Sequence, residues 1–315
     1  MPQIIRVFAP ATVANVSCGF DVLGFAVDSP GDTVEVYLNG KQGVTIDEIT
    51  GDEGRLSLEA NQNTAGIAAA MLLAHIGKPE LGVGIKLHKQ MPLGSGMGSS
   101  AASAVAAAVA VNALLGEPLS RRELLPFALE GERIACGSAH ADNAAPSLLG
   151  GFVLIRSYSP LDVISIPVPE ELFCCVIHPH VEVQTRDARG ILRQKITMEQ
   201  GIKQWGNVGG LIAGLMMKDY DLIGRSLHDE IVEPVRAMLI PGFGRVKAAA
   251  MQAGALGGSI SGSGPSLFAL CRGEETANKV AIAMKAAFLD DGIGSETYVS
   301  KVNREGATVR VSAGN

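Results

Sequence analysis

The sequence has few aromatic residues, little excess charge and no long uninterrupted apolar run. Aromatic residues make up 4% of its 315 residues, with a single tryptophan, so small side chains must provide most of the close packing. The longest apolar stretch, Ala101 to Val111, falls short of the roughly 20 residues that cross a bilayer, which argues against a membrane protein. A net charge of −6 argues against nucleic acid or an anionic membrane surface as the main partner.

The five cysteines include no pair with the spacing Cys-x-x-Cys. An odd number of cysteines in a long chain, with Cys174 and Cys175 adjacent, favours reduced thiols and a cytoplasmic location. The first residues, Met-Pro-Gln-Ile-Ile-Arg, do not have the layout of a signal peptide. Because 47% of the residues are hydrophobic, a chain of this length can bury two cores, and we expect two domains.

Three glycines within five residues mark the most informative stretch of the chain, residues 92–103. Before it, apolar residues alternate with small or polar ones over residues 83–87, which predicts a half-buried strand. After it, residues 99–115 are almost all Ala, Val, Ser and Leu and are followed by Gly116, which predicts a buried helix. A glycine turn that leads into a helix directs backbone N–H groups and the helix dipole at one point. The pattern is typical of a phosphate-binding loop.

By glycine count alone, a simple tight connection explains the stretch equally well. Two familiar phosphate motifs fit poorly, because the dinucleotide fingerprint needs a glycine at Ser99 and the triphosphate P-loop needs a lysine that is absent between Gln90 and Arg121. The stretch Pro92-x-x-x-Gly96-Met97-Gly98-Ser99-Ser100-Ala101 resembles the phosphate loop of the GHMP kinases (galacto-, homoserine, mevalonate and phosphomevalonate kinases). Here methionine replaces the usual leucine, an exchange that keeps volume and apolarity.

A second motif covers residues 11–24, where the polar side chains of Asn15 and Asp21 stand among small and apolar residues. On residue chemistry alone a turn explains this composition, since Asn, Asp and Gly suit turns. From position 14 to position 24 the segment resembles the motif Ser-Ala-Asn-x-x-x-Gly-Phe-Asp-x-x-Gly of homoserine kinases, with Val13 in place of the serine. The resemblance implies that Asp21 binds the ammonium group of the substrate and that Asn15 orients its hydroxyl.

A third motif, Gly-Ser-Ala-His-Ala-Asp-Asn-Ala-Ala-Pro, occupies residues 137–146. His140 and Asp142 could suggest a transition-metal site, but no third ligand lies nearby in the sequence. Homoserine kinases carry a glutamate and then Gly-Ser-x-His-x-Asp-Asn-x-Ala-Pro at this place. The resemblance implies that Asn143 helps to orient the substrate hydroxyl.

The same resemblance implies a magnesium site. Counting back from Asn143 places the metal-binding glutamate of the family at Glu132 and not at Glu130. Ser100, in the phosphate loop, is the second implied protein ligand. A small number of oxygen ligands suits Mg²⁺, which takes its other positions from water and phosphate.

Two arginines carry the remaining substrate contacts that the resemblance implies. Arg189 and Arg236 lie in the patterns Thr-x-x-Ala-Arg and Glu-Pro-x-Arg, where homoserine kinases hold the amino-acid carboxylate. The planar guanidinium group donates two parallel hydrogen bonds to a carboxylate. Thr185 opens the first pattern and is included in the substrate site. Without the resemblance, exposed surface positions are the ordinary explanation for such arginines.

The residues assigned to the nucleotide base rest on the least specific part of the resemblance. Homoserine kinases line the adenine pocket with an asparagine and a lysine that match Asn63 and Lys89, although a helix N-cap and an exposed residue at a strand end explain these two equally well. A second glycine-rich stretch, residues 257–266, matches a further family motif, and we expect it to provide shape and backbone amides only.

The resemblance extends over essentially the whole chain. It implies an α+β protein with the two-domain GHMP-kinase fold: an ATP-binding N-terminal domain, residues 1–160, with a left-handed βαβ-type crossover, and a ferredoxin-like C-terminal domain, residues 161–315. Capping boxes begin at Ser120 and Thr197. The patterns predict strands at 4–8, 33–38, 83–87, 152–155, 163–168, 173–178, 267–271 and 296–302, and helices at 64–76, 99–115, 120–134, 185–189, 200–217, 222–231 and 274–288.

The implied activity is transfer of the γ-phosphoryl group of ATP to the side-chain hydroxyl of L-homoserine, with Mg²⁺, in threonine biosynthesis. The expected partners are these two small molecules and a second copy of the chain. We expect no general base, because asparagine cannot act as one, and we do not assign the proton to His140. The implied ATP-binding residues are Asn63, Lys89, Pro92, Leu93, Gly94, Ser95, Gly96, Met97, Gly98, Ser99, Ser100 and Ala101.

Two other functions remain open at this point. One is a different small-alcohol kinase of the same superfamily, such as a mevalonate-pathway or shikimate enzyme. The other is a nucleotide-binding regulator without turnover, against which the presence of both Ser100 and Glu132 argues.

Overall fold

The computed structural model describes residues 3–311, apart from the side chains of residues 135, 136 and 311. Its strands are β1 (Ile4–Ala14), β2 (Leu23–Leu38), β3 (Val44–Thr50), β4 (Val83–His88), β5 (Phe152–Tyr158), β6 (Leu161–Ile166), β7 (Leu172–Pro179), β8 (Gly257–Ile260), β9 (Leu267–Arg272), β10 (Ser295–Lys301) and β11 (Thr308–Val311). Its helices are α1 (Thr64–His75), α2 (Ser99–Leu114), α3 (Arg121–Cys136), α4 (Ala141–Leu149), α5 (Thr185–Gly190), α6 (Met198–Met217), α7 (Tyr220–Ser226), α8 (Glu233–Arg236), α9 (Phe243–Gln252) and α10 (Glu274–Asp290), with 3₁₀ turns η1 (Ala60–Gln62) and η2 (Ala237–Leu239).

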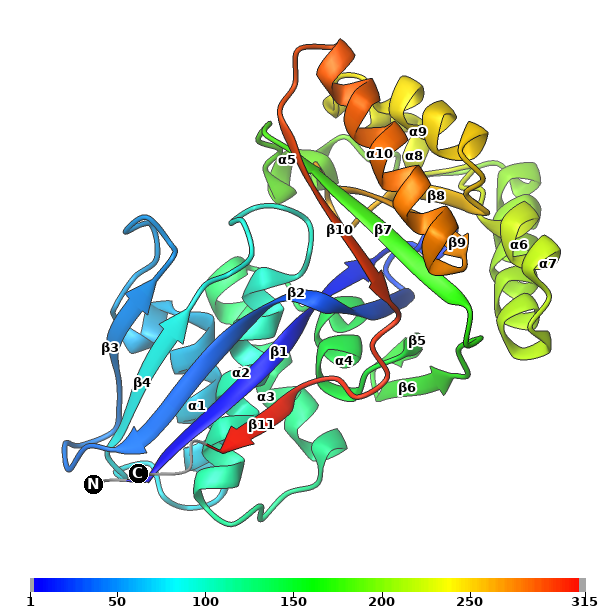
Figure 1. The fold of residues 1–315 in the computed structure, drawn as a ribbon. Coiled ribbons are helices and arrows are strands. Elements are labelled where there is room, and N and C mark those ends of the chain that lie inside the picture. The colour runs from blue at the N-terminus through cyan, green and yellow to red at the C-terminus, as the bar shows by residue number, and fades with distance from the viewer. Residues whose placement is uncertain (1–2, 312–315) are drawn as a thin grey trace.

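The first domain is built on a seven-stranded sheet (Figure 1). Its main path runs β11-β1-β2-β4-β3, while β5 pairs with the start of β2 and β6 pairs with β5. Strands β3 and β4 are parallel and are joined through α1, which is the crossover unit that the resemblance predicts. The predicted boundary at residue 160 runs through this sheet, because β6 and β11 both follow it in the sequence.

Helix α2 lies at the centre of the first domain. It packs against β1 and β2 on one side and against α1, α3 and α4 on the others. Nearly every side chain from Ser99 to Asn112 is buried. A helix that is apolar on all sides must be enclosed, and small residues such as Ala and Ser let several neighbours approach it closely. The composition of residues 99–115 therefore explains both the position of α2 and the scarcity of large aromatic residues.

The second domain is a four-stranded antiparallel sheet in the order β10-β7-β9-β8, with α9 and α10 packed on it. The elements follow one another as strand, helix, strand, strand, helix, strand, which is the ferredoxin-like arrangement expected. Helices α5 to α8 are inserted between β7 and α9. The core continues between the domains, where the rings of Phe25 and Phe268 meet edge to face with their centres 6.0 Å apart.

Most predicted elements are confirmed, including both capping boxes. The predicted helix over residues 222–231 is wrong in its second half, because α7 ends at Ser226. The carboxylate of Asp229 accepts hydrogen bonds from the backbone N–H groups of residues 231, 232 and 233, and this local alternative competes with a helix. Strands β3, β8 and β11 and helices α4, α8 and α9 are further elements that the sequence pattern did not predict.

The structure bears on two expectations from composition, that the thiols are reduced and that no helix spans a membrane. Among the described residues, Cys18, Cys174, Cys175 and Cys271 have free, buried thiols. None of the described helices is both long enough and apolar enough to cross a lipid bilayer.

Candidate active site

Most of the predicted site residues line one cavity of about 340 Å³ to which both domains contribute. Three predicted residues, Pro92, Met97 and Ala101, are not among those that line it, and Met97 and Ala101 are buried in the core. The predicted residues that do line it are Asn15, Asp21, Asn63, Lys89, Leu93, Gly94, Ser95, Gly96, Gly98, Ser99, Ser100, Glu132, Asn143, Thr185, Arg189 and Arg236.

One wall of the cavity is the glycine turn that joins β4 to α2. Gly94, Gly96 and Gly98 all have positive φ angles, between 68° and 77°, which side chains with a Cβ rarely adopt. Within the described residues, no hydrogen bond uses an N–H group of residues 94–100 as donor. The hydroxyl of Ser95 is also buried without a partner. Buried polar groups normally find partners, so these unused donors indicate an anion-binding loop.

The second glycine-rich stretch holds this turn in place from the other domain. The Ser261 hydroxyl donates to the Gly96 carbonyl at 2.8 Å, and the Ser266 N–H donates to the Ser95 carbonyl at 3.2 Å. A Cβ atom at position 96 would lie only 2.5 Å from the Ser261 carbonyl oxygen. The two loops can approach this closely because Gly96 has no Cβ atom, and the cavity therefore lies where the domains meet.

The lining of the same cavity includes a carboxylate and two guanidinium groups. Arg189 donates from Nη2 to both carboxylate oxygens of Asp21, at 2.9 and 3.1 Å. Arg236 is only 3% exposed and donates to the carbonyls of Ala188 and Gly262. Both guanidinium groups face the ring of Phe20, at 5.7 and 5.0 Å from its centre. These groups suit a zwitterion, which carries one charge of each sign.

Two family models match this chain, and both describe domains of one superfamily. The model for the N-terminal domain of GHMP kinases matches residues 63–151, and the model for the C-terminal domain matches residues 211–290. A curated homoserine kinase from Chlorobium phaeovibrioides is 53% identical over 97% of this chain and 99% of its own length. A crystal structure of homoserine kinase from Cytophaga hutchinsonii is 61% identical, covers 98% of both chains and superposes with a TM-score of 0.96. The chain belongs to the homoserine kinase family.

More distant structures share only the fold. The crystal structure of L. major mevalonate kinase in complex with R-mevalonate is 15% identical and superposes with a TM-score of 0.73 over 94% of this chain and 95% of its own. The GHMP architecture predicted from the resemblance is therefore confirmed by relatives at high and low identity.

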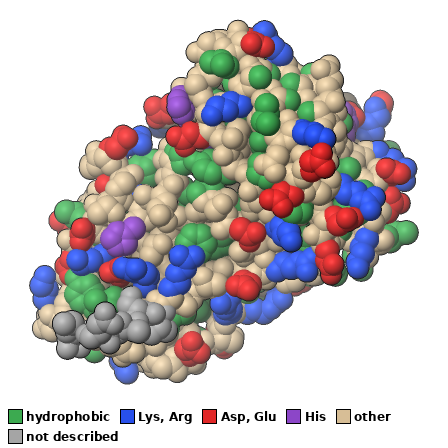
Figure 2. All heavy atoms as spheres, viewed as in Figure 1, with side chains coloured by type: hydrophobic (Ala, Val, Ile, Leu, Met, Phe, Trp, Pro, Cys, Tyr) green, Lys and Arg blue, Asp and Glu red, His purple; other side chains and the backbone are tan. Residues whose placement is uncertain are grey.

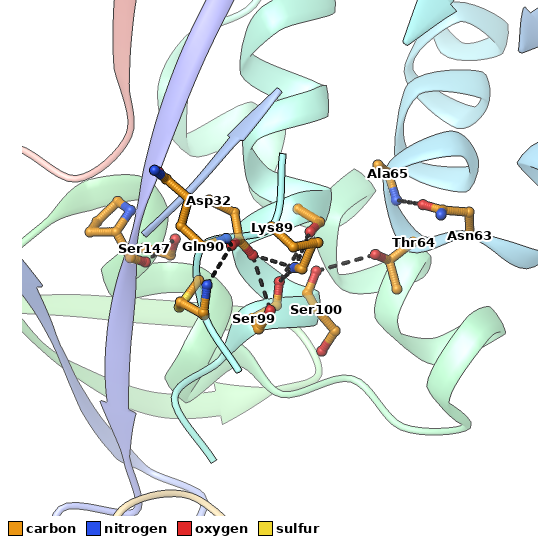
Figure 3. A network of polar contacts seen from close by, with 12 residues as sticks. Asp32, Asn63, Thr64, Ala65, Lys89, Gln90, Ser99, Ser100 and Ser147 are labelled. Carbon is orange, nitrogen blue, oxygen red and sulfur yellow. Dashed lines mark hydrogen bonds and ion pairs between the residues drawn. The ribbon is translucent and has the colours of Figure 1, made fainter. Parts of the chain in front are cut away.

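Figure 3 shows a polar network beside the phosphate loop that the homoserine kinase motifs did not predict. The fully buried Asp32 accepts hydrogen bonds from the backbone N–H groups of Gln90 and Met91, at 2.8 and 3.2 Å, and from the Ser99 hydroxyl at 3.0 Å. Its fourth partner is the ammonium group of Lys89, which forms an ion pair with it. Asp32 thus binds the residues on both sides of the loop, just before and just after the glycines.

Lys89 has no N–H group left for a nucleotide in this arrangement. Its ammonium donates to Asp32, to the Ser99 carbonyl at 2.9 Å and to the Ser103 hydroxyl at 2.8 Å, which uses all three donors. Its side chain is buried, so it is not the exposed lysine that a strand end suggests. Its contacts favour a role in fixing the first turn of α2 over direct contact with adenine.

Asn63 is the N-cap of α1, as the sequence suggests. Its side-chain oxygen accepts from the Ala65 N–H at 3.0 Å, and its amide donates to the Ser57 carbonyl at 3.0 Å. It also lines the cavity with one N–H still available, so capping and base binding are compatible.

Ser100 and Glu132 lie next to each other, as the resemblance implies. The Ser100 hydroxyl donates to the Glu132 carboxylate at 3.1 Å from the first turn of α2 to the middle of α3. Burial raises the pKa of Glu132 to about 7, against the opposing effects of the Ser100 hydrogen bond and the Lys89 charge. Two hard oxygen donors on rigid helices fit Mg²⁺, which keeps its other ligands from water and phosphate. The described residues contain no cluster of three or more His, Cys, Asp or Glu side chains suited to a metal ion.

The two asparagines differ in how much of their hydrogen-bonding capacity is used. Asn15 accepts from the Asp21 N–H at 2.9 Å and donates to the Gly262 carbonyl at 2.7 Å, so it joins the two domains at the cavity. Asn143 accepts from the Thr12 hydroxyl at 2.8 Å and keeps both N–H groups for a ligand. Asn143 is thus the better placed of the two to contact a substrate hydroxyl.

Three residues at the site were not assigned from the sequence. Asp32 contacts the phosphate loop and Phe20 contacts the two arginines, although neither is among the residues that line the cavity. Asp142 does line the cavity and has one carboxylate oxygen without a partner. Burial, together with the charge of Asp21, raises the pKa of Asp142 to about 7. Phe20 and Asp142 both lie inside motifs that the sequence analysis identified, which is the signal that could have found them. His140 also lines the cavity, and burial lowers its pKa, which favours the neutral imidazole over the charged form.

Proposed function

We propose that the chain transfers the γ-phosphoryl group of ATP to the side-chain hydroxyl of L-homoserine, giving O-phospho-L-homoserine, a step in threonine biosynthesis. One observation carries this proposal. A single cavity has unused backbone N–H groups of residues 94–100 on one wall and the charged groups of Asp21, Arg189 and Arg236 on another. The first wall suits a polyphosphate and the second suits an amino acid. The name and the high identity of the curated relatives support the same substrate.

Phosphoryl transfer depends on stabilising the charge of the phosphoryl oxygens and on aligning the acceptor hydroxyl with the phosphate, and it needs no covalent intermediate with the protein. The N–H groups of residues 94–100 and the hydroxyl of Ser95 would bind the phosphate oxygens. Ser100 and Glu132 would hold Mg²⁺, which supplies positive charge beside the phosphates when it is bound. Asp32 keeps both ends of the loop fixed, so the donors need little rearrangement when the nucleotide binds.

Homoserine would be held at three points. Its ammonium group would bind Asp21, its carboxylate would bind Arg189 and Arg236 beside Thr185, and its hydroxyl would accept a hydrogen bond from Asn143. Asn15 would orient the same hydroxyl through its remaining N–H group. Because no carboxylate or neutral amine is assigned to the hydroxyl, its proton would pass to a phosphoryl oxygen or to water.

The setting of the reaction follows from its co-substrate. We place the enzyme in the cytoplasm, where ATP is available and thiols stay reduced, and we propose that it works as a homodimer.

Phosphoryl transfer from ATP should be measured with the purified chain, Mg²⁺ and a panel of acceptors that includes L-homoserine, mevalonate and shikimate. We expect the highest kcat/KM with L-homoserine. A preference for an acceptor without an amino group would overturn the substrate assignment, and ATP binding with no transfer to any acceptor would favour a nucleotide-binding regulator.

A further inference from the structure

The second half of β1 connects the phosphate loop with the second domain. Strand β11 pairs with residues 5–8 of β1, so further along the strand that edge of β1 is open to other partners. The Thr12 N–H donates to the Met97 carbonyl at 3.0 Å, and the Ala14 carbonyl accepts from the Gly262 N–H at 3.1 Å. Both glycine-rich stretches of the cavity are therefore attached to one strand.

The side chain of Thr12 has a different partner, the amide of Asn143 in the first turn of α4. Its hydroxyl donates to Oδ1 of Asn143 at 2.8 Å, and Thr12 is only 1% exposed. Branching at Cβ restricts the rotamers of threonine, so burial fixes the direction of this donor. One turn further along α4, the Ser147 hydroxyl donates to the Pro10 carbonyl at 3.0 Å (Figure 3). Strand β1 thus holds α4 at two points.

The bond from Thr12 decides which end of the Asn143 amide faces the cavity. An amide side chain has an acceptor oxygen at one end and two N–H donors at the other. Its oxygen is bound to Thr12 and lies beside Gly98, where a Cβ atom would be 2.7 Å from it. Asn143 lines the cavity, and within the described residues no hydrogen bond uses its N–H groups. The donor end is therefore the one available to a ligand.

The end of the amide that meets the acceptor hydroxyl matters for the proton. In phosphoryl transfer a lone pair of the hydroxyl oxygen forms the bond to the γ-phosphorus, and the bond to the bridging oxygen breaks with its electron pair left on ADP. The hydroxyl proton leaves to a phosphoryl oxygen or to water. An N–H donor binds the hydroxyl oxygen and leaves that proton free to depart. A reversed amide would accept the O–H hydrogen and hold it, since an amide oxygen is too weak a base to remove it.

We propose that Thr12 is a positioning residue for phosphoryl transfer, whose buried hydroxyl keeps the N–H groups of Asn143 directed at the acceptor oxygen. This inference rests on the proposed function and adds a residue that is not among those lining the cavity. Because the Thr12 N–H also binds the Met97 carbonyl, one residue places the phosphate loop and the acceptor amide in a common frame. The face drawn in Figure 2 mixes acidic and basic side chains without a large patch of one sign. It exerts no strong directing field, so short contacts of this kind set the alignment.

The first test compares Thr12→Val with Thr12→Ser in steady-state transfer to L-homoserine. Valine keeps the branched shape without the donor, so the amide oxygen would face a methyl group and the amide would turn away. We expect kcat to fall about 10–100-fold in Thr12→Val, with both KM values changed less than about threefold, and to fall less than about threefold in Thr12→Ser. Retention of kcat by Thr12→Val, or an equal loss in both variants, overturns the proposal.

Ser147→Ala is the matched control. It removes the other hydrogen bond between α4 and β1, also from a buried hydroxyl, but one turn away from the Asn143 amide. The urea midpoint of unfolding should fall about as far as in Thr12→Val, whereas kcat should change less than about threefold. An equal loss of kcat would show that Thr12 acts only by holding α4 on β1, which would overturn the assigned role.

The second test asks whether Thr12 acts through Asn143. In an Asn143→Ala background, Thr12→Val should change kcat less than about twofold, because the amide that it positions is gone. A loss as large as that in the native background overturns the proposal.

The direction of the amide is tested by Asn143→Asp, which has no N–H group and presents an oxygen to the acceptor. We expect kcat to fall at least as far as in Asn143→Ala. A kcat close to that of the native chain would show that the amide oxygen faces the hydroxyl, and would overturn the proposal.

Failure of this inference can be told apart from failure of the proposed function. A native chain that transfers no phosphoryl group to L-homoserine defeats both. A loss of kcat in Asn143→Ala without a loss in Thr12→Val defeats the role of Thr12 alone.

Discussion

Arg189 and Asp21, 168 residues apart in the sequence, form a hydrogen-bonded ion pair inside the cavity. Their side chains are 46% and 33% exposed, so water screens the pair and it contributes only about 0–1 kcal/mol to stability. An amino acid that brings its own ammonium and carboxylate can therefore replace this pair at little cost. Each protein charge then gains a partner of opposite sign on the ligand.

Replacement of Arg189 by alanine should affect the amino acid far more than the nucleotide. We expect the KM for homoserine to rise about 100-fold, equivalent to about 3 kcal/mol for a charge-assisted hydrogen bond, with the KM for ATP changed less than threefold. Steady-state kinetics with each substrate varied in turn measures both values. Arg186→Ala is the control, because Arg186 lies on the same helix with 90% of its side chain exposed. Equal losses for both substrates would contradict the proposed contact.

Substitution of Glu132 tests the magnesium site. Glu132→Gln removes the charge and should lower kcat by a factor of 100 or more and raise the Mg²⁺ concentration needed for half-maximal rate, as expected for a lost oxygen ligand. Glu130→Gln is the matched control on the same helix. Its carboxylate pairs with Arg133, three residues further along α3, so its replacement should change kcat less than twofold. Rates measured over a series of Mg²⁺ concentrations separate the two, and similar losses in both variants would exclude the assigned role.

The free energy of unfolding provides a test of how Glu132 is buried. Folding raises its pKa from 4.5 to about 7, so between these values the folded chain keeps a proton that the unfolded chain has lost. The cost of ionising the buried carboxyl is therefore absent below pH 4.5, grows by about 1.4 kcal/mol per pH unit, and is complete above pH 7. Without Mg²⁺, Glu132→Gln should become more stable than the native chain over this range. Urea titrations at several pH values measure the difference, and a constant difference would contradict the raised pKa.

Local patterns carried most of what the sequence predicted. The glycine turn and the apolar helix after it are specified by neighbouring residues, so both the phosphate loop and α2 could be found without the structure. The cap of Asn63 and the capping boxes are similarly local. Local patterns failed at residues 222–231, where a helix was predicted. The Asp229 carboxylate accepts hydrogen bonds from three backbone N–H groups there, and the helix ends before it.

Contacts between distant segments could not be predicted in this way. Asp32 and Lys89 are 57 residues apart, and neither lies at a spacing that indicates the other. The same holds for β11, which joins the first sheet only because the chain returns to β1 after the second domain. The single boundary predicted at residue 160 divides the chain once, whereas the chain crosses between the domains twice.

Asp32 and Lys89 should act as a unit in positioning the phosphate loop. Removal of one partner leaves an uncompensated buried charge, so Asp32→Asn and Lys89→Met should each lower the free energy of unfolding by about 3–5 kcal/mol. The double variant should lose less than the sum. Each single variant that remains folded should raise the KM for ATP more than the KM for homoserine. A double-mutant cycle by urea unfolding and kinetics tests this, and strict additivity would show that the two side chains act separately.

Catalysis should require glycine at position 98 more strictly than at position 94, because a side chain at position 98 would collide with its neighbours. Both residues have positive φ angles, so alanine at either costs about 1–2 kcal/mol of backbone strain. A Cβ atom at position 98 would also collide with the Thr12 hydroxyl and lie 2.7 Å from Oδ1 of Asn143, whereas at position 94 it would meet nothing within 4 Å. Gly98→Ala should therefore displace Asn143 and the start of α2 and reduce kcat/KM for both substrates at least 100-fold.

Gly94→Ala is the matched control for this clash. It keeps the strain without the collision, so it should lose only the roughly 1–2 kcal/mol of stability that the strain costs and retain kcat within about tenfold. Thermal unfolding and steady-state kinetics on both variants separate the two contributions. If Gly94→Ala and Gly98→Ala lost activity equally, backbone strain alone would explain the requirement for glycine. The close packing of the loop against Thr12 and Asn143 would then have no part in aligning the hydroxyl with the phosphate.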